Sequence, residues 1–155
     1  AMDDRKESLF RDVIRDDFPA MPGARDLIDA LHKAGFLLAV GSSGPPENVE
    51  LVTQMLDPEG RFKARVTGKD VTRGKPDPQV FLIAAQRLGV KPADCAVVED
   101  AVPGVAAANA AGMASIALTG TAKRDALGEA EWIVDSLSEV TPQVVERLIE
   151  RHRGR

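Results

Sequence analysis

The stretch that decides the fold runs from Val97 to Met113 and reads VVEDAVPGVAAANAAGM. It opens with apolar β-branched residues, places Glu99 and Asp100 directly after them, and continues into a run of small residues. The opening is typical of a buried strand, and small residues suit a helix that packs closely on a sheet. The stretch therefore predicts a strand, an acidic turn and a helix in direct succession.

The remainder of the chain alternates between helical and strand patterns. Helices are predicted over residues 4–14, 24–34, 78–88 and 142–151, in the alanine-rich run and around 49–56; strands are predicted over 36–40, 64–67, 96–98, 114–118 and 132–134. In the helix over 78–88, periodicity points four residues inward: Phe81, Leu82, Ala85 and Leu88. Strands that alternate with helices favour right-handed crossovers. We therefore expect an α/β fold, a Rossmann-like parallel sheet with helices on both faces.

Composition limits the classes of partner. With 44% hydrophobic and 28% charged residues among 155, the chain has the balance of a folded globular domain. A net charge of −4 without an internal basic block speaks against nucleic acid, and no apolar run approaches the roughly 18 residues that span a membrane. The single Cys95 favours a reducing compartment, and we expect the cytoplasm. His32 and the basic end from Arg151 to Arg155, with His152, are expected to be solvated.

Polar residues follow the predicted strands, at the edge where parallel sheets bind ligands. Ser42 and Ser43 place a hydroxyl after the first strand, and backbone N–H groups just before a helix favour an anion there. The alternative is that both serines only cap this helix.

Lys75 stands in the segment Gly74-Lys75-Pro76-Asp77-Pro78. Pro76 keeps Lys75 out of helical geometry, and Asp77 and Pro78 fix the start of the next helix. An ammonium presented from a rigid loop suits a phosphoryl oxygen, whereas the alternative is an ordinary loop lysine.

Glu99 and Asp100 follow a third strand. Magnesium takes hard oxygen ligands and keeps several waters, so one or two carboxylates beside a phosphate site make a plausible half-shell. The alternative is that Asp100 caps the following helix and Glu99 is a partly exposed strand end.

In this order, the serine turn, the lysine segment and the acidic turn with its alanine-rich helix make the chain similar to the haloacid dehalogenase (HAD) superfamily. The resemblance covers about residues 22–136 and points to the phosphatase and β-phosphoglucomutase-like branch. It implies that Ser42 and Lys75 are catalytic, that both bind phosphate together with the N–H of Ser43, and that Glu99 and Asp100 hold Mg²⁺. The implied function is a magnesium-dependent phosphohydrolase of a small phosphorylated metabolite. A sugar-phosphate mutase and a non-catalytic phosphate- or metal-binding remnant remain alternatives.

The resemblance also implies a nucleophilic Asp-x-Asp pair on a central strand near the amino end, followed by a helical cap. No Asp-x-Asp occurs in these 155 residues. We therefore expect residues 1–19 to be a cap remnant, and residues 20–155 to be a HAD-like core that is incomplete at its N-terminal central strand. The chain alone is expected to be inactive, because its Ser, Lys and acids stabilise charge without attacking phosphorus. The strands over 37–40 and 96–98 should pair directly or accept a strand from elsewhere, for example by self-association.

Overall fold

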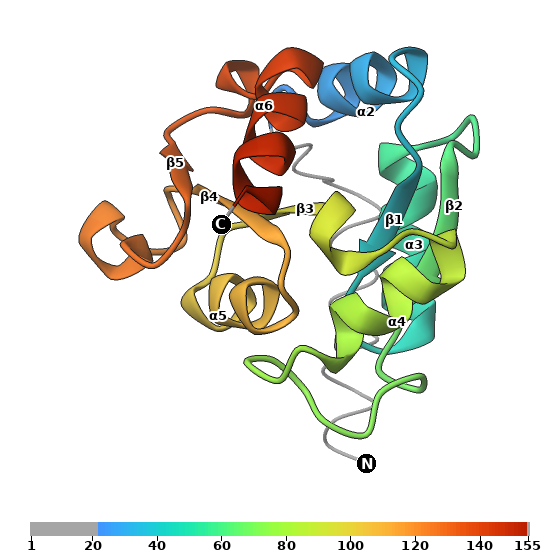
Figure 1. The fold of residues 1–155 in the computed structure, drawn as a ribbon. Coiled ribbons are helices and arrows are strands. Elements are labelled where there is room, and N and C mark those ends of the chain that lie inside the picture. Colours follow the sequence, from blue (N-terminus) through green and yellow to red (C-terminus); the bar gives the residue numbers. More distant parts are fainter. Residues whose placement is uncertain (1–21, 155) are drawn as a thin grey trace.

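The computed structural model describes residues 22–154. In it, parallel strands alternate with helices (Figure 1). The helix predicted over 4–14 and the cap remnant expected over 1–19 lie outside these residues. The strands are β1 (Leu38–Gly41), β2 (Phe62–Val66), β3 (Ala96–Glu99), β4 (Ala114–Leu118) and β5 (Trp132–Val134). The α-helices are α2 (Ala24–Lys33), α3 (Pro46–Leu56), α4 (Gln79–Leu88), α5 (Val102–Ala110) and α6 (Pro142–Arg153), with single turns η1 (Pro92–Asp94), η2 (Arg124–Leu127) and η3 (Leu137–Glu139). The predicted α/β class is confirmed.

The strands form two separate sheets, ordered β1-β2 and β3-β4-β5. Ala39 aligns with Ala64 in the first sheet, and Val97 aligns with Ser115 in the second. The break falls between β1 and β3, the two strands for which unpaired edges are expected. Among residues 22–154 no pairing joins them, so direct pairing is not how their edges are satisfied.

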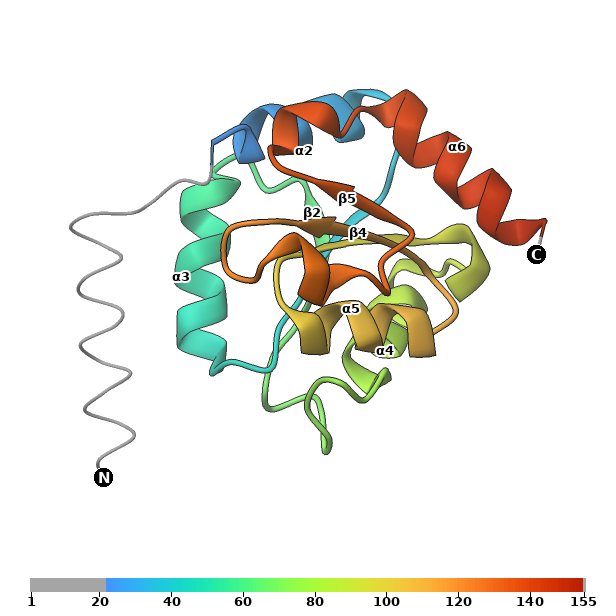
Figure 2. The same ribbon diagram turned by 90° about the vertical axis from the view of Figure 1, so that its left-hand side faces the viewer.

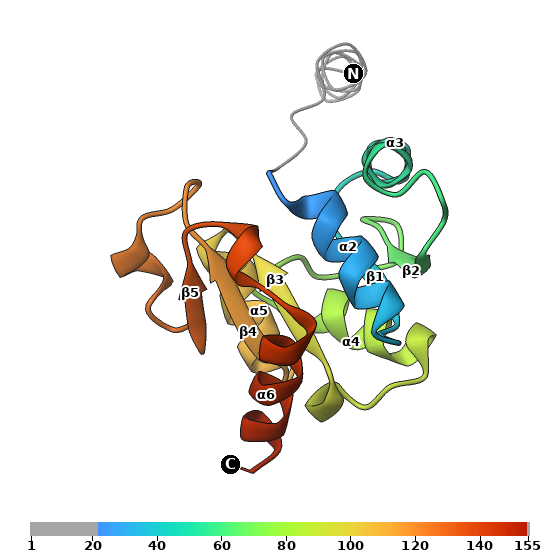
Figure 3. The same cartoon turned by 90° about the horizontal axis from the view of Figure 1, so that it is seen from above.

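Helices hold the two sheets together. Helix α4 packs on β1 and β2, α5 packs on β3 and β4, and these two helices contact each other on one side of the molecule (Figure 2). On the other side α2 contacts β1 while α6 contacts β3 and β4 (Figure 3). The core is correspondingly divided. Ala107 and Ala108 of α5 pack with Phe81 of α4, whereas Leu148 of α6 packs with Ile116 of β4.

Two predictions about side-chain position are wrong. Leu82 is 41% exposed, because the buried face of α4 consists of Val80, Phe81, Ala84 and Ala85, and Leu82 lies to one side of this stripe. The expectation that His152 is solvated is also wrong, whereas Arg155 lies outside the described residues. Helix α6 continues to Arg153 because no helix breaker interrupts it before Gly154. His152 therefore lies on a helix, where its side chain is partly buried. There its Nδ1 lies 2.6 Å from Glu131 Oε1 and its Nε2 lies 2.6 Å from Gly112 O.

Within the described chain, no helix combines the length and the apolar character needed to cross a membrane.

Candidate active site

The serine turn follows the end of β1. The N–H of Ser42 donates to Val66 O at 3.0 Å, which continues the β1-β2 ladder by one residue. The hydroxyl of Ser42 accepts from the N–H of Gly44 at 3.0 Å. Helix α3 has Pro45 at its N-cap and no side-chain cap, so neither serine caps it. The hydroxyls therefore lie in the turn without serving the helix.

Two glycines let neighbouring loops close on this turn. The N–H of Gly68, which follows β2, donates to Gly44 O at 2.7 Å, and a Cβ on Gly68 would lie 2.6 Å from Ser43 O. A Cβ on Gly74 would lie 3.7 Å from Ser43 Oγ, so the lysine segment borders the same turn. The sequence elements predicted to bind phosphate are thus adjacent in space.

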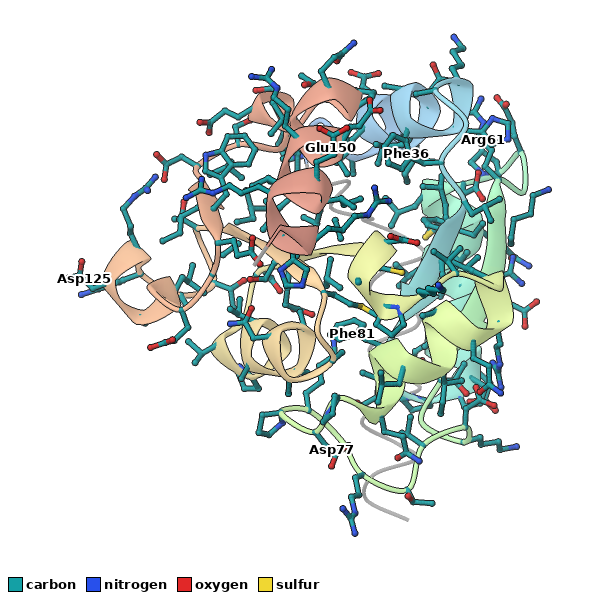
Figure 4. All side chains as sticks on the ribbon, viewed as in Figure 1. Phe36, Arg61, Asp77, Phe81, Asp125 and Glu150 are labelled. Carbon is teal, nitrogen blue, oxygen red and sulfur yellow. The ribbon has the colours of Figure 1, made fainter. Side chains whose placement is uncertain are left out.

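Lys75 reaches across from the loop before α4 to both sheets. Its Nζ lies 2.8 Å from Glu99 Oε2 at the end of β3 and 3.4 Å from Gly41 O at the end of β1. It also lies 5.0 Å from the ring centroid of Phe81, a cation–π contact. Figure 4 shows Phe81 between the two halves of the molecule, whereas Asp77 lies at its periphery. The Lys75 side chain is 20% exposed and that of Glu99 is 13% exposed, so the pair is largely shielded.

The lysine loop is fixed by its own helix. Gln79, the first residue of α4, accepts from the N–H groups of Thr72 at 2.8 Å and Arg73 at 2.9 Å. Asp77 accepts in turn from the N–H of Gln79 at 2.9 Å. The helix begins one residue later than predicted, at Gln79, with Pro78 as its N-cap residue. These bonds give Lys75 the rigid setting that the proline spacing predicts.

Glu99 occupies space that only a glycine leaves open. A Cβ added to Gly104, in the first turn of α5, would lie 2.0 Å from Glu99 Cδ. Glu99 Oε1 also accepts from the N–H of Asp100 at 3.2 Å. The carboxylate therefore rests against the amino end of α5, where the helix dipole favours negative charge.

Asp100 does not cap α5, whose N-cap residue is Ala101 and carries no side-chain cap. Its Oδ2 accepts from Thr121 Oγ1 at 2.6 Å. Sequence reasoning missed Thr121, which lies 21 residues further along the chain. The available signal was topological, because Thr121 follows β4, and parallel neighbours end at the same edge.

The donor set fits magnesium in part. Glu99 and Asp100 supply two hard oxygen ligands, and a magnesium site commonly combines one or two carboxylates with waters and phosphate oxygens. No cluster of three or more His, Cys, Asp or Glu side chains suited to a metal exists in residues 22–154. A metal held here would therefore take its remaining ligands from water, phosphate or groups beyond these residues.

Comparisons with known proteins identify the family of the chain. A family model described as haloacid dehalogenase-like hydrolase matches residues 3–112. The chain belongs to this family. The HAD-like chain is 36% identical over 127 residues to validoxylamine A 7'-phosphate phosphatase of Streptomyces hygroscopicus subsp. limoneus. This match covers 80% of the chain and 60% of that protein. It is 39% identical over 124 residues to hexitol phosphatase A of Escherichia coli, covering 79% of the chain and 56% of that protein.

A solved structure also matches almost the whole HAD-like chain. It is a HAD hydrolase, family IA, variant 3, from Entamoeba histolytica, with a TM-score of 0.86 and 26% identity over 96% of this chain and 70% of that one. The HAD-like chain spans 60% and 56% of the two phosphatases. Its fold and family are thus those of longer HAD-like hydrolases.

Proposed function

We propose that this HAD-like chain supplies the phosphate- and metal-binding part of a magnesium-dependent phosphohydrolase that acts on a small phosphorylated metabolite. The observation that carries the proposal is the position of Lys75, whose Nζ contacts both the end of β1 and Glu99 at the end of β3. The two relatives that are phosphatases support the same function.

Each residue has a role in this proposal. The Lys75 ammonium and the Ser42 hydroxyl bind oxygens of the transferring phosphoryl group, and the N–H of Ser43 adds a backbone donor. Glu99 and Asp100 would hold Mg²⁺, which supplies neutralisation of phosphoryl charge when bound. Thr121 orients the Asp100 carboxylate through its hydrogen bond.

These 155 residues supply no attacking group of the Asp-x-Asp type. The chain contains no Asp-x-Asp, and charge stabilisation alone does not form the bond to phosphorus. We propose that residues 20–155 form the core, that residues 1–19 belong to a cap, and that the 155 residues alone do not turn over substrate.

Binding and turnover test the proposal separately. Inorganic phosphate should bind more tightly when Mg²⁺ is present, measured by calorimetry, because the cation and the anion share the site. Lys75→Met should weaken phosphate binding, and Asp100→Asn should remove the effect of Mg²⁺. Absence of phosphate binding in both conditions would instead favour a remnant without a phosphate site.

Turnover is measured with p-nitrophenyl phosphate and Mg²⁺ on the same preparation. We expect the rate to equal that of the Asp100→Asn variant, which controls for contaminating phosphatases. A rate that Asp100→Asn abolishes would contradict the expected inactivity, while leaving the proposed binding roles intact.

A further inference from the structure

The ammonium of Lys75 lies over the ring of Phe81, with 5.0 Å between Nζ and the ring centroid. Phe81 is the third residue of α4, and its N–H donates to Pro78 O at 3.1 Å in the turn that opens this helix. The loop that carries Lys75 therefore folds back over the first turn of the helix that follows it.

The ring of Phe81 is fixed by its surroundings. Phe81 is 6% exposed and belongs to the core that α4 shares with Ala107 and Ala108 of α5. A Cβ on Gly41, the last residue of β1, would lie 3.1 Å from Phe81 Cε1 and 3.2 Å from Phe81 Cδ1. These distances are shorter than ordinary van der Waals contacts, so a side chain at position 41 would push the ring away. Gly41 thus lets the ring lie directly against the end of β1.

Gly41 also binds Lys75 through its backbone. Gly41 O lies 3.4 Å from Lys75 Nζ, and Glu99 Oε2 lies 2.8 Å from the same nitrogen. An ammonium has three N–H donors, so the two acceptors found among residues 22–154 leave one donor for a ligand. Two oxygens and the face of one ring therefore surround Nζ.

The ring does more than fill space at this position. A lysine stem is flexible, and each contact on its ammonium restricts the positions that the charge can take. A leucine at position 81 would also exclude water, but only an aromatic face attracts a cation, and this attraction grows where water is excluded. The Lys75 side chain is 20% exposed, so the contact is largely shielded.

We propose that Phe81 is a positioning residue for Lys75 and holds the ammonium where its remaining N–H reaches an oxygen of a phosphoryl group. This inference rests on the proposed role of Lys75 in phosphate binding. Phe81 does not touch phosphate and acts through Lys75. Gly41 completes the arrangement, because it admits the ring and accepts from the ammonium.

Fluorination of the ring tests the proposal with little change in packing. Phenylalanine analogues with one, two and three ring fluorines, incorporated at position 81 alone, weaken the negative face of the ring in steps. The Kd for inorganic phosphate in the presence of Mg²⁺, measured by calorimetry, should rise with each fluorine, by about 3- to 10-fold over the series. The same series in the Lys75→Met background should leave the Kd of that variant unchanged, because the cation is absent.

Hydrogen exchange of the Lys75 ammonium with water, followed by nitrogen-15 NMR in the phosphate-free chain, gives a readout independent of the proposed function. An ammonium held over a shielding ring exchanges slowly, so each fluorine should accelerate exchange, by about 3- to 10-fold over the series. If the natural chain binds no phosphate, the proposed function fails, while this series still decides whether Phe81 holds Lys75 in place.

Phe81→Leu and Phe62→Leu form a matched pair of variants. Phe62 pairs with Leu38, at the opposite end of β1 from Gly41. Phe81→Leu should weaken phosphate binding and accelerate ammonium exchange, whereas Phe62→Leu should change neither by more than about twofold. If Phe81→Leu does not fold, the fluorinated series carries the comparison alone.

An unchanged Kd together with an unchanged exchange rate across the fluorinated series would overturn the proposal. Equal changes of the Kd in the natural and Lys75→Met backgrounds would overturn it as well, because the ring would then act through packing only.

Discussion

Gly104 determines where a charge can rest. The missing side chain leaves room for the Glu99 carboxylate against the first turn of α5, from which Oε2 reaches Lys75 at 2.8 Å. The need for glycine is steric, since Gly104 belongs to a helix and has no left-handed conformation. The absence of a side chain at Gly104, in the first turn of α5, thus leaves Glu99 the room it needs to pair with Lys75.

Gly104→Ala should uncouple Lys75 from Glu99. The new Cβ would overlap the end of the Glu99 side chain, which is flexible and swings away. A double-mutant cycle with Lys75→Met and Glu99→Gln should give a coupling of about 1–2 kcal/mol in the natural chain and about 0.3 kcal/mol or less in the Gly104→Ala background. Urea unfolding of the eight variants provides these values.

Gly128→Ala is the matched control, because a Cβ there meets its nearest atom at 3.4 Å and the residue has φ −59°. The coupling should survive in that background. An undiminished coupling in Gly104→Ala would show that Glu99 reaches Lys75 by another path.

Helix α4 is tied to the end of β2 by an ion pair. Arg87 Nη2 lies 2.9 Å from Asp70 Oδ1, and Arg87 Nη1 donates to Arg65 O at 2.5 Å. The N–H of Thr67 donates to Asp70 Oδ2 at 2.8 Å. The hydrogen bond from Arg87, followed by that from Thr67, lowers the pKa of Asp70 from 3.8 to about 2. One carboxylate therefore joins the helix to the loop that leads to the lysine segment.

The contribution of Asp70 to stability should depend on pH in a defined window. Because its pKa is lower in the folded chain, the ionised form stabilises the fold above about pH 4, and this stabilisation is lost as the pH falls toward 2. Urea midpoints of the natural chain and Asp70→Asn should differ at pH 7 and converge near pH 2. Glu146→Gln, at an exposed position of α6, should show no such convergence. A difference that stays constant down to pH 2 would contradict this assignment.

His152 anchors the last turn of α6. Its two ring nitrogens contact Glu131, just before β5, and the carbonyl of Gly112, just before β4. Arg153 adds a 2.6 Å contact to Asp94. The end of this helix is thus held to the amino ends of the second sheet.

Replacement of His152 by alanine should lower the free energy of unfolding by about 1–2 kcal/mol, because two polar contacts are lost, of which the one to Glu131 is partly buried. The neighbouring exposed residue gives a control: Arg151→Ala should stay within about 0.5 kcal/mol of the natural chain. Equal effects of the two variants in urea unfolding would mean that the histidine contacts add nothing.

At the scale of the molecule, periodicity and turn chemistry were sufficient for most elements. The strands over 114–118 and 132–134 occur as predicted, and Gly89 ends α4 in a left-handed conformation with φ 71°. Leu82 was misplaced because Phe81 and Leu82 are adjacent, and periodicity alone does not tell which of them borders the stripe. His152 was misplaced because its partners, Glu131 and Gly112, are distant in sequence.

The residues of the candidate site can be predicted from local sequence, whereas the contacts between them depend on the tertiary fold. Ser42, Lys75, Glu99 and Asp100 are visible in sequence because each follows or borders a strand or helix boundary. Their pairing is not visible, since the contact of Lys75 with Glu99 depends on how two sheets are held by helices. Thr121 is not predicted for a related reason, because its hydrogen bond to Asp100 forms only when β4 lies beside β3.

The division into two sheets also divides the chemistry. Ser42 and Lys75, which are proposed to bind phosphate, belong to the unit of β1, β2 and α4, whereas Glu99 and Asp100 follow β3 and precede α5. A rigid-body displacement of one unit against the other would therefore separate the proposed phosphate site from the proposed metal site while leaving each intact. The alignment of the two is set by tertiary contacts between the units, namely the packing of α4 on α5 and the contact of Lys75 with Glu99.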